Sequence, residues 1–265
     1  MIAEIKSRHN PLVKEIRAAF RGGRLNAGRL LPFEGPMLLT EAFKSQAHVD
    51  SLLVEDISLL DPKLLDWLND QSTRLFRVSH DLMASIAETE TPVGIVGLAR
   101  VPRWDPERLL SQKSGVFLVL VGIQDPGNMG TILRTAEAFG VTAVWVTTKT
   151  VSPFNPKAVR ASAGSIFRIP VLPGCNDVQL HEKLRRHQIT TVATSVGAPH
   201  SIETFPFRLP VALWIGQEAT GLPKSLISAC QDQVRIPMCE SVQSLNVAIA
   251  TGILLYEIRK HEQND

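Results

Sequence analysis

Three polar segments in the second half of the chain carry residue types that can do chemistry. They read DPGNMGTILRTAEAFG (Asp125 to Gly140), LWIGQEATGLP (Leu213 to Pro223) and IPMCESVQSLNVAIATGILLYE (Ile236 to Glu257). Each combines a glycine or serine cluster with an apolar strand or helix, and glycine permits a close approach of the backbone to a ligand. We therefore expect the polar residues of the three segments to line one pocket.

Asn128 and Arg134 are the candidate functional residues of the first segment. The apolar run VFLVLVGI predicts a strand leading into QDPGNMG, and a helix is expected to begin near Asn128 with free N–H groups facing the pocket. An amide donates and accepts hydrogen bonds, and a guanidinium can bind a phosphate or a developing alkoxide. The plainer alternative is a capping asparagine followed by a surface arginine.

Glu218 is the candidate of the second segment, because it follows the predicted strand VALWIG and ligands of open α/β sheets bind beyond the carboxyl ends of strands. An acidic cap in an exposed loop is its alternative. In the third segment Ser241 and Ser244 could cap the last helix, while Ser244 and Asn246 could bind a substrate. Asn246 beside an apolar helical face calls for a hydrogen-bond partner.

The composition excludes several classes of protein. Apolar residues make up 44% and charged residues 20% of the 265, and no stretch approaches the roughly 18 apolar residues of a membrane span. The beginning of the chain does not resemble a secretory signal. Cys175, Cys230 and Cys239 show no CxxC spacing, which argues against disulfides and a metal site and fits a reducing cytoplasm. The GxGxxG spacing of a nicotinamide site is also missing.

The length suggests two domains, with a boundary near residue 104 at the proline-containing linker RVPRWDPERLLSQKSG. Residues 1–104 alternate predicted helices and strands, as in a smaller α/β domain. Residues 105–265 indicate a mostly parallel sheet covered on both faces, with strands at VFLVLVGI, TAVWVTT, ITTVATSV and VALWIG. The last helix is apolar nearly all round and is predicted to be buried, partly by a second subunit.

The first 35 residues are basic, whereas the whole chain has a net charge of only +2. They hold seven Lys and Arg, between Lys6 and Arg29, against Glu4, Glu15 and Glu34. Such a cluster can bind a phosphate backbone, although basic surface helices are also common without that function.

Taken in order, the three segments read NxGxxxRxAxxFG, GxExxGL and IPMxxxxxSLNVAxA. This order resembles the signature motifs of the TrmH/SpoU family of RNA ribose 2′-O-methyltransferases over residues 114–260. The resemblance implies a catalytic domain with a deep trefoil knot and S-adenosylmethionine as cofactor. It also implies a homodimer through the C-terminal domain, in which the motif-one helix and the C-terminal helix pack across the two-fold axis.

The N-terminal domain resembles the ribosomal-protein-like substrate-binding domain of the same family. The similar stretches are IKSRHNPLVKEI, FEGPMLLTEAF and ETPVGIVGLA. The resemblance implies that the basic run from Lys6 to Arg29 and the turn from Glu34 to Pro36 help to bind RNA.

Site residues follow from the same resemblance. Those matching positions that hold the cofactor are Gly216, Ile236, Met238 and Leu245. Those matching positions of catalysis or substrate placement are Asn128, Arg134, Glu218, Ser244 and Asn246. Gln217 and Ala219 depart from the usual GNEGxGL pattern of the second motif, which bears on the conformation of the cofactor loop.

The expected reaction is methyl transfer to a ribose 2′-hydroxyl of structured RNA, with ribosomal RNA favoured over transfer RNA. Because the sulfonium methyl is already activated, alignment should dominate catalysis. We expect Arg134 to contact the phosphate and the 2′-oxygen, with Asn128 and Glu218 fixing Arg134 and the ribose. A general-base role for the arginine is the alternative, although a guanidinium hardly deprotonates. A non-catalytic dimeric RNA-binding protein and a nucleotide-dependent oxidoreductase are the rival functions.

Overall fold

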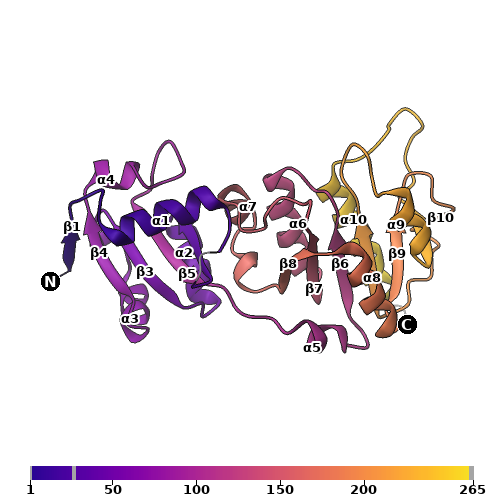
Figure 1. The fold of residues 1–265 in the computed structure, drawn as a ribbon, viewed down its shortest axis with the longest axis horizontal. Coiled ribbons are helices and arrows are strands. Elements are labelled where there is room, and N and C mark those ends of the chain that lie inside the picture. The colour runs from indigo at the N-terminus through magenta and orange to yellow at the C-terminus, as the bar shows by residue number, and fades with distance from the viewer. Residues whose placement is uncertain (1, 26–27, 263–265) are drawn as a thin grey trace. The chain divides into compact units, whose positions relative to one another are not determined.

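The computed structural model describes residues 2–25 and 28–262 and divides into two compact units (Figure 1). The first contains the chain up to Arg103 together with Phe154–Arg168, and the second contains Trp104–Pro153 and the chain from Ile169 onward. One division therefore falls within the predicted linker. The segment Phe154–Arg168, which the sequence places in the second domain, packs with the first unit. The predicted linker also contains a helix, α5 (Pro106–Leu110).

The first unit is built on a five-stranded mixed sheet in the order β1-β4-β3-β5-β2. β4 is parallel to β1 and β3, whereas β5 is antiparallel to β3 and β2. The strands are β1 (Ala3–Ile5), β2 (Leu30–Glu34), β3 (Val49–Val54), β4 (Arg74–Val78) and β5 (Ile95–Arg100). The helices are α1 (Pro11–Gly22), α2 (Pro36–Lys44), η1 (Ile57–Leu59), α3 (Pro62–Asp70), α4 (His80–Ala84), α7 (Pro156–Ala161) and η2 (Ser165–Phe167).

The apolar face predicted for the first helix is present in α1. Leu12, Val13, Ile16 and Phe20 are all buried, in keeping with their helical spacing. The helix begins where the side chain of Asn10 accepts a hydrogen bond from the Leu12 N–H, and its first residue is a proline.

The second unit holds a seven-stranded sheet in the order β10-β12-β9-β11-β6-β7-β8, with every neighbouring pair parallel. This confirms the predicted α/β class, and the trefoil knot stays a prediction. The strands are β6 (Val116–Leu120), β7 (Ala143–Thr147), β8 (Val171–Cys175), β9 (Thr190–Thr194), β10 (His200–Ser201), β11 (Val211–Ile215) and β12 (Asp232–Arg235). Its longer helices are α6 (Pro126–Ala138), α8 (Asp177–Arg186) and α10 (Val247–Glu262), and α9 (Lys224–Ala229) is short.

The two central strands bring the first and second motifs together. Every residue of β6 and β11 is buried, as expected for apolar runs inside a parallel sheet. Leu120 and Ile215 are register partners at the carboxyl ends of these strands, and the Val121 N–H donates to the Ile215 carbonyl at 2.9 Å. The turns that follow the strands therefore leave the sheet side by side.

The third motif reaches the same place because α10 packs against α6 (Figure 1). At the amino ends of the two helices, the Asn246 amide donates to the side chain of Asn128. At their carboxyl ends, the Arg259 guanidinium donates to the carbonyls of Phe139 and Gly140. The helices thus run parallel, and each pair of ends is joined by side-chain hydrogen bonds.

The helix predicted to begin near Asn128 does so: α6 starts at Pro126, and the Asp125 carboxylate caps it by accepting from the Asn128 N–H. The caps predicted for the last helix were wrong. α10 is capped by Asn246, whose Oδ1 accepts from the N–H groups of the second and third residues after it, and not by Ser241 or Ser244.

A single chain buries only one side of the last helix, so its predicted burial by a second subunit stays a prediction. Val247, Leu254 and Ile258 are buried, but Ile249 is 57% exposed and Tyr256 is 56% exposed. Among the described residues, no helix has the length and hydropathy needed to cross a membrane.

Candidate active site

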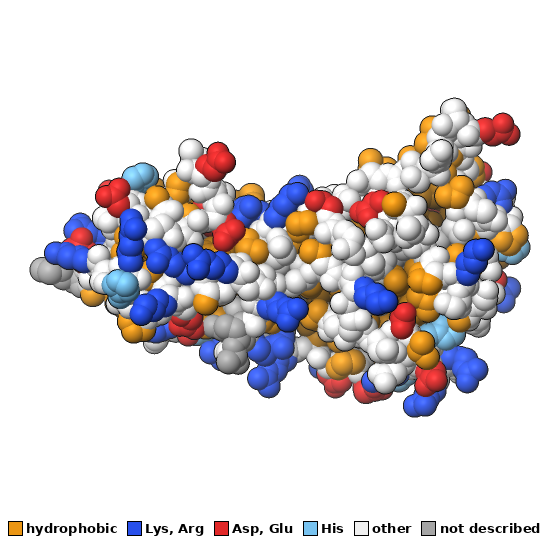
Figure 2. Space-filling view, turned by 45° about the horizontal axis from the view of Figure 1, so that its top comes forward, with side chains coloured by type: hydrophobic (Ala, Val, Ile, Leu, Met, Phe, Trp, Pro, Cys, Tyr) orange, Lys and Arg blue, Asp and Glu red, His pale blue; other side chains and the backbone are white. Residues whose placement is uncertain are grey.

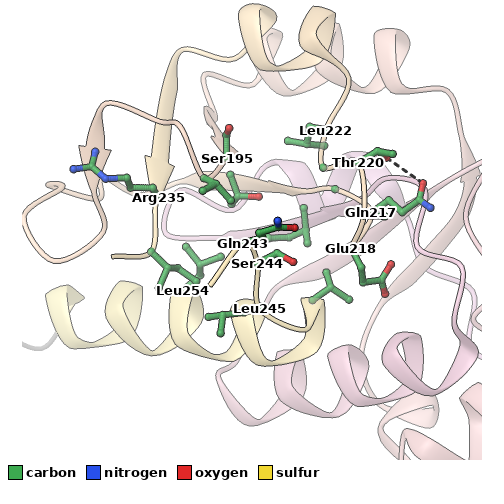
Figure 3. A pocket seen from close by; sticks show the side chains of 18 of the residues that line it. Ser195, Gln217, Glu218, Thr220, Leu222, Arg235, Gln243, Ser244, Leu245 and Leu254 are labelled. Carbon is green, nitrogen blue, oxygen red and sulfur yellow. Dashed lines mark hydrogen bonds between the residues drawn. The ribbon is translucent and has the colours of Figure 1, made fainter. Parts of the chain in front are cut away.

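A cavity of about 550 Å³ lies beyond the carboxyl ends of β9, β11 and β12 in the second unit (Figure 3). Its volume is within the range of small-molecule sites, and its position agrees with the general rule for ligands of open α/β sheets. The loop after β11, the segment between β12 and α10, and α10 itself complete the wall. Among the lining residues are Thr194, Ser195, Gly216, Gln217, Glu218, Ile236, Met238, Gln243, Ser244, Leu245 and Leu254.

The loop after β11 folds tightly over Gly216. A Cβ atom at this position would lie 2.3 Å from the backbone of Gly221 and Leu222, a distance that no side chain tolerates. The Gly221 N–H donates to the Gln217 carbonyl at 2.8 Å, and Gly221 has a φ of +65°, in the left-handed region that favours glycine. The backbone of this turn consequently forms one wall of the cavity.

The two departures from the usual motif are accommodated by this loop. The Gln217 side chain accepts from the Thr220 hydroxyl at 3.3 Å, and Glu218 leaves the loop in a different direction (Figure 3). Gln217 also lies beside Gly122, where an added Cβ would be 3.6 Å from the Cβ of the glutamine. Ala219 is exposed. The glutamine therefore packs between the turns that follow β6 and β11.

All four predicted cofactor residues, Gly216, Ile236, Met238 and Leu245, line the cavity. The cavity combines a glycine-restricted backbone turn with the apolar side chains of Ile236, Met238 and Leu245. This combination fits S-adenosylmethionine, whose polar ends need backbone hydrogen bonds and whose adenine needs an apolar wall.

Sequence reasoning missed the wall contributed by β9 and β12. Thr194 and Ser195 at the end of β9 line the cavity, and the Thr194 hydroxyl donates to the Trp214 carbonyl of β11 at 2.9 Å. Arg235 at the end of β12 also lines it, and its guanidinium donates to the carbonyls of Ala198 and Pro199. Only the strand order, which the sequence does not reveal, could have indicated these residues.

Three predicted catalytic residues form a chain of hydrogen bonds that we call the relay: Asn246, Asn128 and Glu218. The Asn246 Nδ2 donates to the Asn128 Oδ1 at 3.0 Å, and the Asn128 Nδ2 donates to the Glu218 Oε1 at 2.7 Å. Asn246 Oδ1 must face the N–H groups that it caps, so its Nδ2 must face Asn128. The orientation of both amides, and hence the donor offered to Glu218, follows from the helix cap.

Ser244 and Arg134 lie outside the relay. Ser244 is exposed and lines the cavity. Arg134 is six residues beyond Asn128 on α6 and so lies about 120° around the helix from it. It is exposed and has no hydrogen bond or ion pair with another described residue. Within one chain, therefore, Asn128 and Glu218 bind each other and do not fix Arg134 as expected.

The turn predicted to bind RNA in the first unit uses its carboxylate internally. Glu34 is only 7% exposed, and its carboxylate accepts from the N–H groups of Glu88 and Thr89 and from the Thr89 hydroxyl. Pro36 and Met37, which begin α2, are exposed instead. If this turn contacts RNA, these two residues and not the glutamate must provide the surface.

The chain is similar to known proteins over nearly its full length. Residues 115–256 match the SpoU rRNA methylase family, and residues 10–97 match the MRM3-like substrate binding domain. An uncharacterized tRNA/rRNA methyltransferase from Synechocystis sp. is 36% identical, with 98% of this chain and 95% of the relative covered. The 23S rRNA (guanosine(2553)-2′-O)-methyltransferase RlmP of Bacillus subtilis is 30% identical, with coverage of 97% and 99%.

Solved structures agree with these matches. The AdoMet-bound rRNA methyltransferase from Sinorhizobium meliloti has a TM-score of 0.82 and 30% identity, with 98% of each chain covered. AviRb of Streptomyces viridochromogenes, a SpoU methyltransferase in complex with AdoMet, has a TM-score of 0.85 and 26% identity, with 96% of this chain and 99% of that chain covered.

A parallel sheet with a ligand cavity at its carboxyl edge, bordered by a polar relay, defines an α/β ligand-binding domain, and the matches above make it a methyltransferase domain. This chain belongs to the SpoU rRNA methylase family. The predictions of an RNA methyltransferase and of S-adenosylmethionine as its cofactor are confirmed. The roles of the individual site residues stay predictions.

Proposed function

We propose that this protein transfers a methyl group from S-adenosylmethionine to a ribose 2′-hydroxyl of ribosomal RNA. The observation that carries the proposal is the position of Glu218. This residue lines the cavity and also accepts the last hydrogen bond of the relay. A methyl donor in the cavity and a hydroxyl held by the relay would therefore be neighbours.

The cofactor would supply an activated methyl group, and the chain must supply alignment. Asn128 occupies one carboxylate oxygen of Glu218, and the other oxygen has no partner among the described residues. That oxygen can accept a hydrogen bond from the ribose hydroxyl. Through this hydrogen bond Glu218 would take up the hydroxyl proton as the oxygen–methyl bond forms and the methyl–sulfur bond of the donor breaks, which would leave S-adenosylhomocysteine. We assign Ser244, on the cavity wall, to the placement of the ribose.

We further propose that the protein works as a homodimer through α6 and α10. Ile249 and Tyr256 form an exposed apolar strip on α10, and the Tyr256 ring meets edge-on, at 6.5 Å, the ring of Phe139, which directly follows α6. A second copy covering this strip would remove it from water. Arg134 is exposed on α6, so in such a dimer we assign it to the phosphate and ribose bound at the partner subunit's relay.

The test is to incubate the protein with total RNA and a labelled methyl donor and to map the modified nucleotide. We expect one 2′-O-methylated ribose in 23S rRNA and no label in DNA of the same sequence. Binding of S-adenosylmethionine without transfer to any RNA would favour the non-catalytic alternative. Label on a base would contradict the assignment of the hydroxyl. A cytoplasmic location belongs to the same proposal.

A further inference from the structure

We propose that a basic cavity in the first unit binds a backbone phosphate of the RNA substrate. The proposal rests on the proposed function and adds a second contact, separate from the methyl-transfer site. The cavity has a volume of about 420 Å³ and lies where β2 and β3 begin and β5 ends. The basic residues that line it are Arg29, His48, Arg100 and Arg103.

The sheet itself holds the basic residues together. Arg29 comes directly before β2, His48 directly before β3, and Arg100 ends β5. The Val101 N–H donates to the Arg29 carbonyl at 3.3 Å, and the Arg100 N–H donates to the His48 carbonyl at 2.7 Å. These backbone bonds tie three neighbouring strands at one end of the sheet. Three basic residues are consequently fixed around one cavity.

Among the described residues that line this cavity, no carboxylate compensates the charge of the arginines. Three arginines and one histidine line it, and none of the lining residues is Asp or Glu. The nearby carboxylate of Glu41 binds Lys44 at 2.9 Å and Arg168 at 2.8 Å and is already occupied. Figure 2 shows many Lys and Arg side chains over the first unit. A cluster of like charges without a counterion favours an anion.

The guanidinium donors are also largely unused. Among the described residues, the Arg29 side chain makes one long hydrogen bond of 3.4 Å, from Nη2 to the Pro102 carbonyl, and its Nε is buried without an acceptor. Arg100 and Arg103 are exposed and have no side-chain partner in the described part of the chain. By contrast, Arg74 on β4 is paired with Asp50. The arginines of the cavity thus remain available for an incoming ligand.

Phosphate is the ligand that matches these donors. The planar guanidinium binds two phosphate oxygens at once, and several arginines around one anion share its charge. Arg29 has a φ of 59°, a left-handed conformation that is disfavoured for a residue with a side chain. A contact between these arginines and a backbone phosphate fixes the position of the RNA on the protein without reading the RNA sequence.

The experiment uses the full chain and an in vitro transcript of 23S rRNA. Arg29→Ala, Arg100→Ala and Arg103→Ala are compared with wild type by fluorescence anisotropy at several KCl concentrations. The matched control is Lys63→Ala, which removes one positive charge from an exposed position on α3 outside the cavity. Thermal unfolding of each variant tests folding, and Arg100→Lys and Arg103→Gln serve as milder substitutions.

We expect each cavity variant to raise the Kd for RNA about five- to tenfold near physiological salt. The salt dependence, the slope of log K against log[KCl], should fall by about 0.7–0.9 for each phosphate that the variant no longer binds. Affinity for S-adenosylmethionine and the rate at saturating RNA should not change. Lys63→Ala should behave like wild type.

Wild-type Kd and salt dependence in all folded cavity variants would overturn the proposal, while methylation by the wild type would still uphold the proposed function. A wild type that binds the transcript but methylates no RNA would instead refute the proposed function alone. Inorganic phosphate is the second probe. If the variants no longer bind inorganic phosphate but keep the full affinity for RNA, the cavity binds free phosphate and its assignment to RNA is wrong.

Discussion

Asn128→Asp tests the relay most directly, because it keeps the shape of the side chain and replaces the donor that faces Glu218 with an acceptor. The wild-type bond is 2.7 Å long and ends on a carboxylate. Loss of such a charge-assisted hydrogen bond costs about 1.5–3 kcal/mol. Two unit charges about 4 Å apart repel by roughly 4 kcal/mol at an effective dielectric constant of 20.

Both side chains are half-buried, so solvent reduces the repulsion to about 1–2 kcal/mol. The expected loss in the free energy of unfolding is therefore about 2.5–5 kcal/mol. At roughly 2–4 °C for each kcal/mol, the melting temperature of the unit should fall by about 10 °C. Circular dichroism with thermal and urea unfolding measures both quantities.

The double variant Asn128→Asp with Glu218→Gln restores a donor across the same gap. Its glutamine amide can donate to the new carboxylate, and the pair again carries one negative charge. We expect stability to return to within about 1 kcal/mol of wild type, while methylation stays low because the carboxylate beside the cavity has been moved. A double variant no more stable than Asn128→Asp alone would refute the relay as a stabilising contact. Full methylation by it would refute the role assigned to Glu218.

Three other features of the second unit can be tested in the same way. Gly216→Ala places a Cβ 2.3 Å from backbone atoms of its own loop and should distort the wall of the cavity. Calorimetry should then show at least about a tenfold loss of affinity for S-adenosylmethionine. Unchanged affinity would mean that the loop does not form the cofactor wall. Burial raises the pKa of the Cys230 thiol to about 12, which leaves only about one thiolate in ten thousand at pH 8. Iodoacetamide should therefore label the exposed Cys239 and spare Cys230 until the pH approaches that value, and equal labelling of both at pH 8 would contradict the burial. Ile249→Glu should give a monomer in sedimentation, because it puts a charge on the apolar strip of α10. The control Val178→Glu, at a similarly exposed position on α8, should leave the assembly unchanged. A wild type that is itself monomeric would count against the dimer.

The convergence of the motifs could be predicted because it depends on local pattern and on one general rule. β6 and β11 are continuous apolar runs, and such runs pair inside parallel sheets with their carboxyl ends at one edge. Gly216 could be recognised as special because a glycine at the end of a buried strand signals close approach of the backbone. The parts of the site that lie at the end of an apolar strand, next to a turn-forming glycine, could therefore be predicted from the sequence.

The choice between possible helix caps could not be predicted. Ser241, Ser244 and Asn246 are all capping residue types shortly before the apolar stretch of α10. Asn246 is selected because its second amide atom also bonds to Asn128, which is 118 residues away in the chain. This partner comes close only in the folded protein. Local helix-capping propensity therefore cannot tell which of Ser241, Ser244 and Asn246 caps α10.

The position of Phe154–Arg168 could not be predicted for the same reason. Its place in the sequence, between β7 and β8, suggests that it covers the second sheet. Its contacts are instead with the first unit, where the Phe167 ring meets the Phe33 ring edge-on at 6.5 Å and Arg168 binds Glu41 at 2.8 Å. Contacts between residues more than 120 positions apart leave no trace in a local pattern.

The relay is joined through the backbone to the wall of the cofactor cavity. Asn246 directly follows Leu245, which lines the cavity, and its Oδ1 holds the first turn of α10 while its Nδ2 orients Asn128. Most of the preceding segment, residues 239–244, is exposed and makes few contacts of its own. A ligand that packs on Leu245 would therefore contact the residue directly before the cap, and the donor offered to Glu218 depends on that cap.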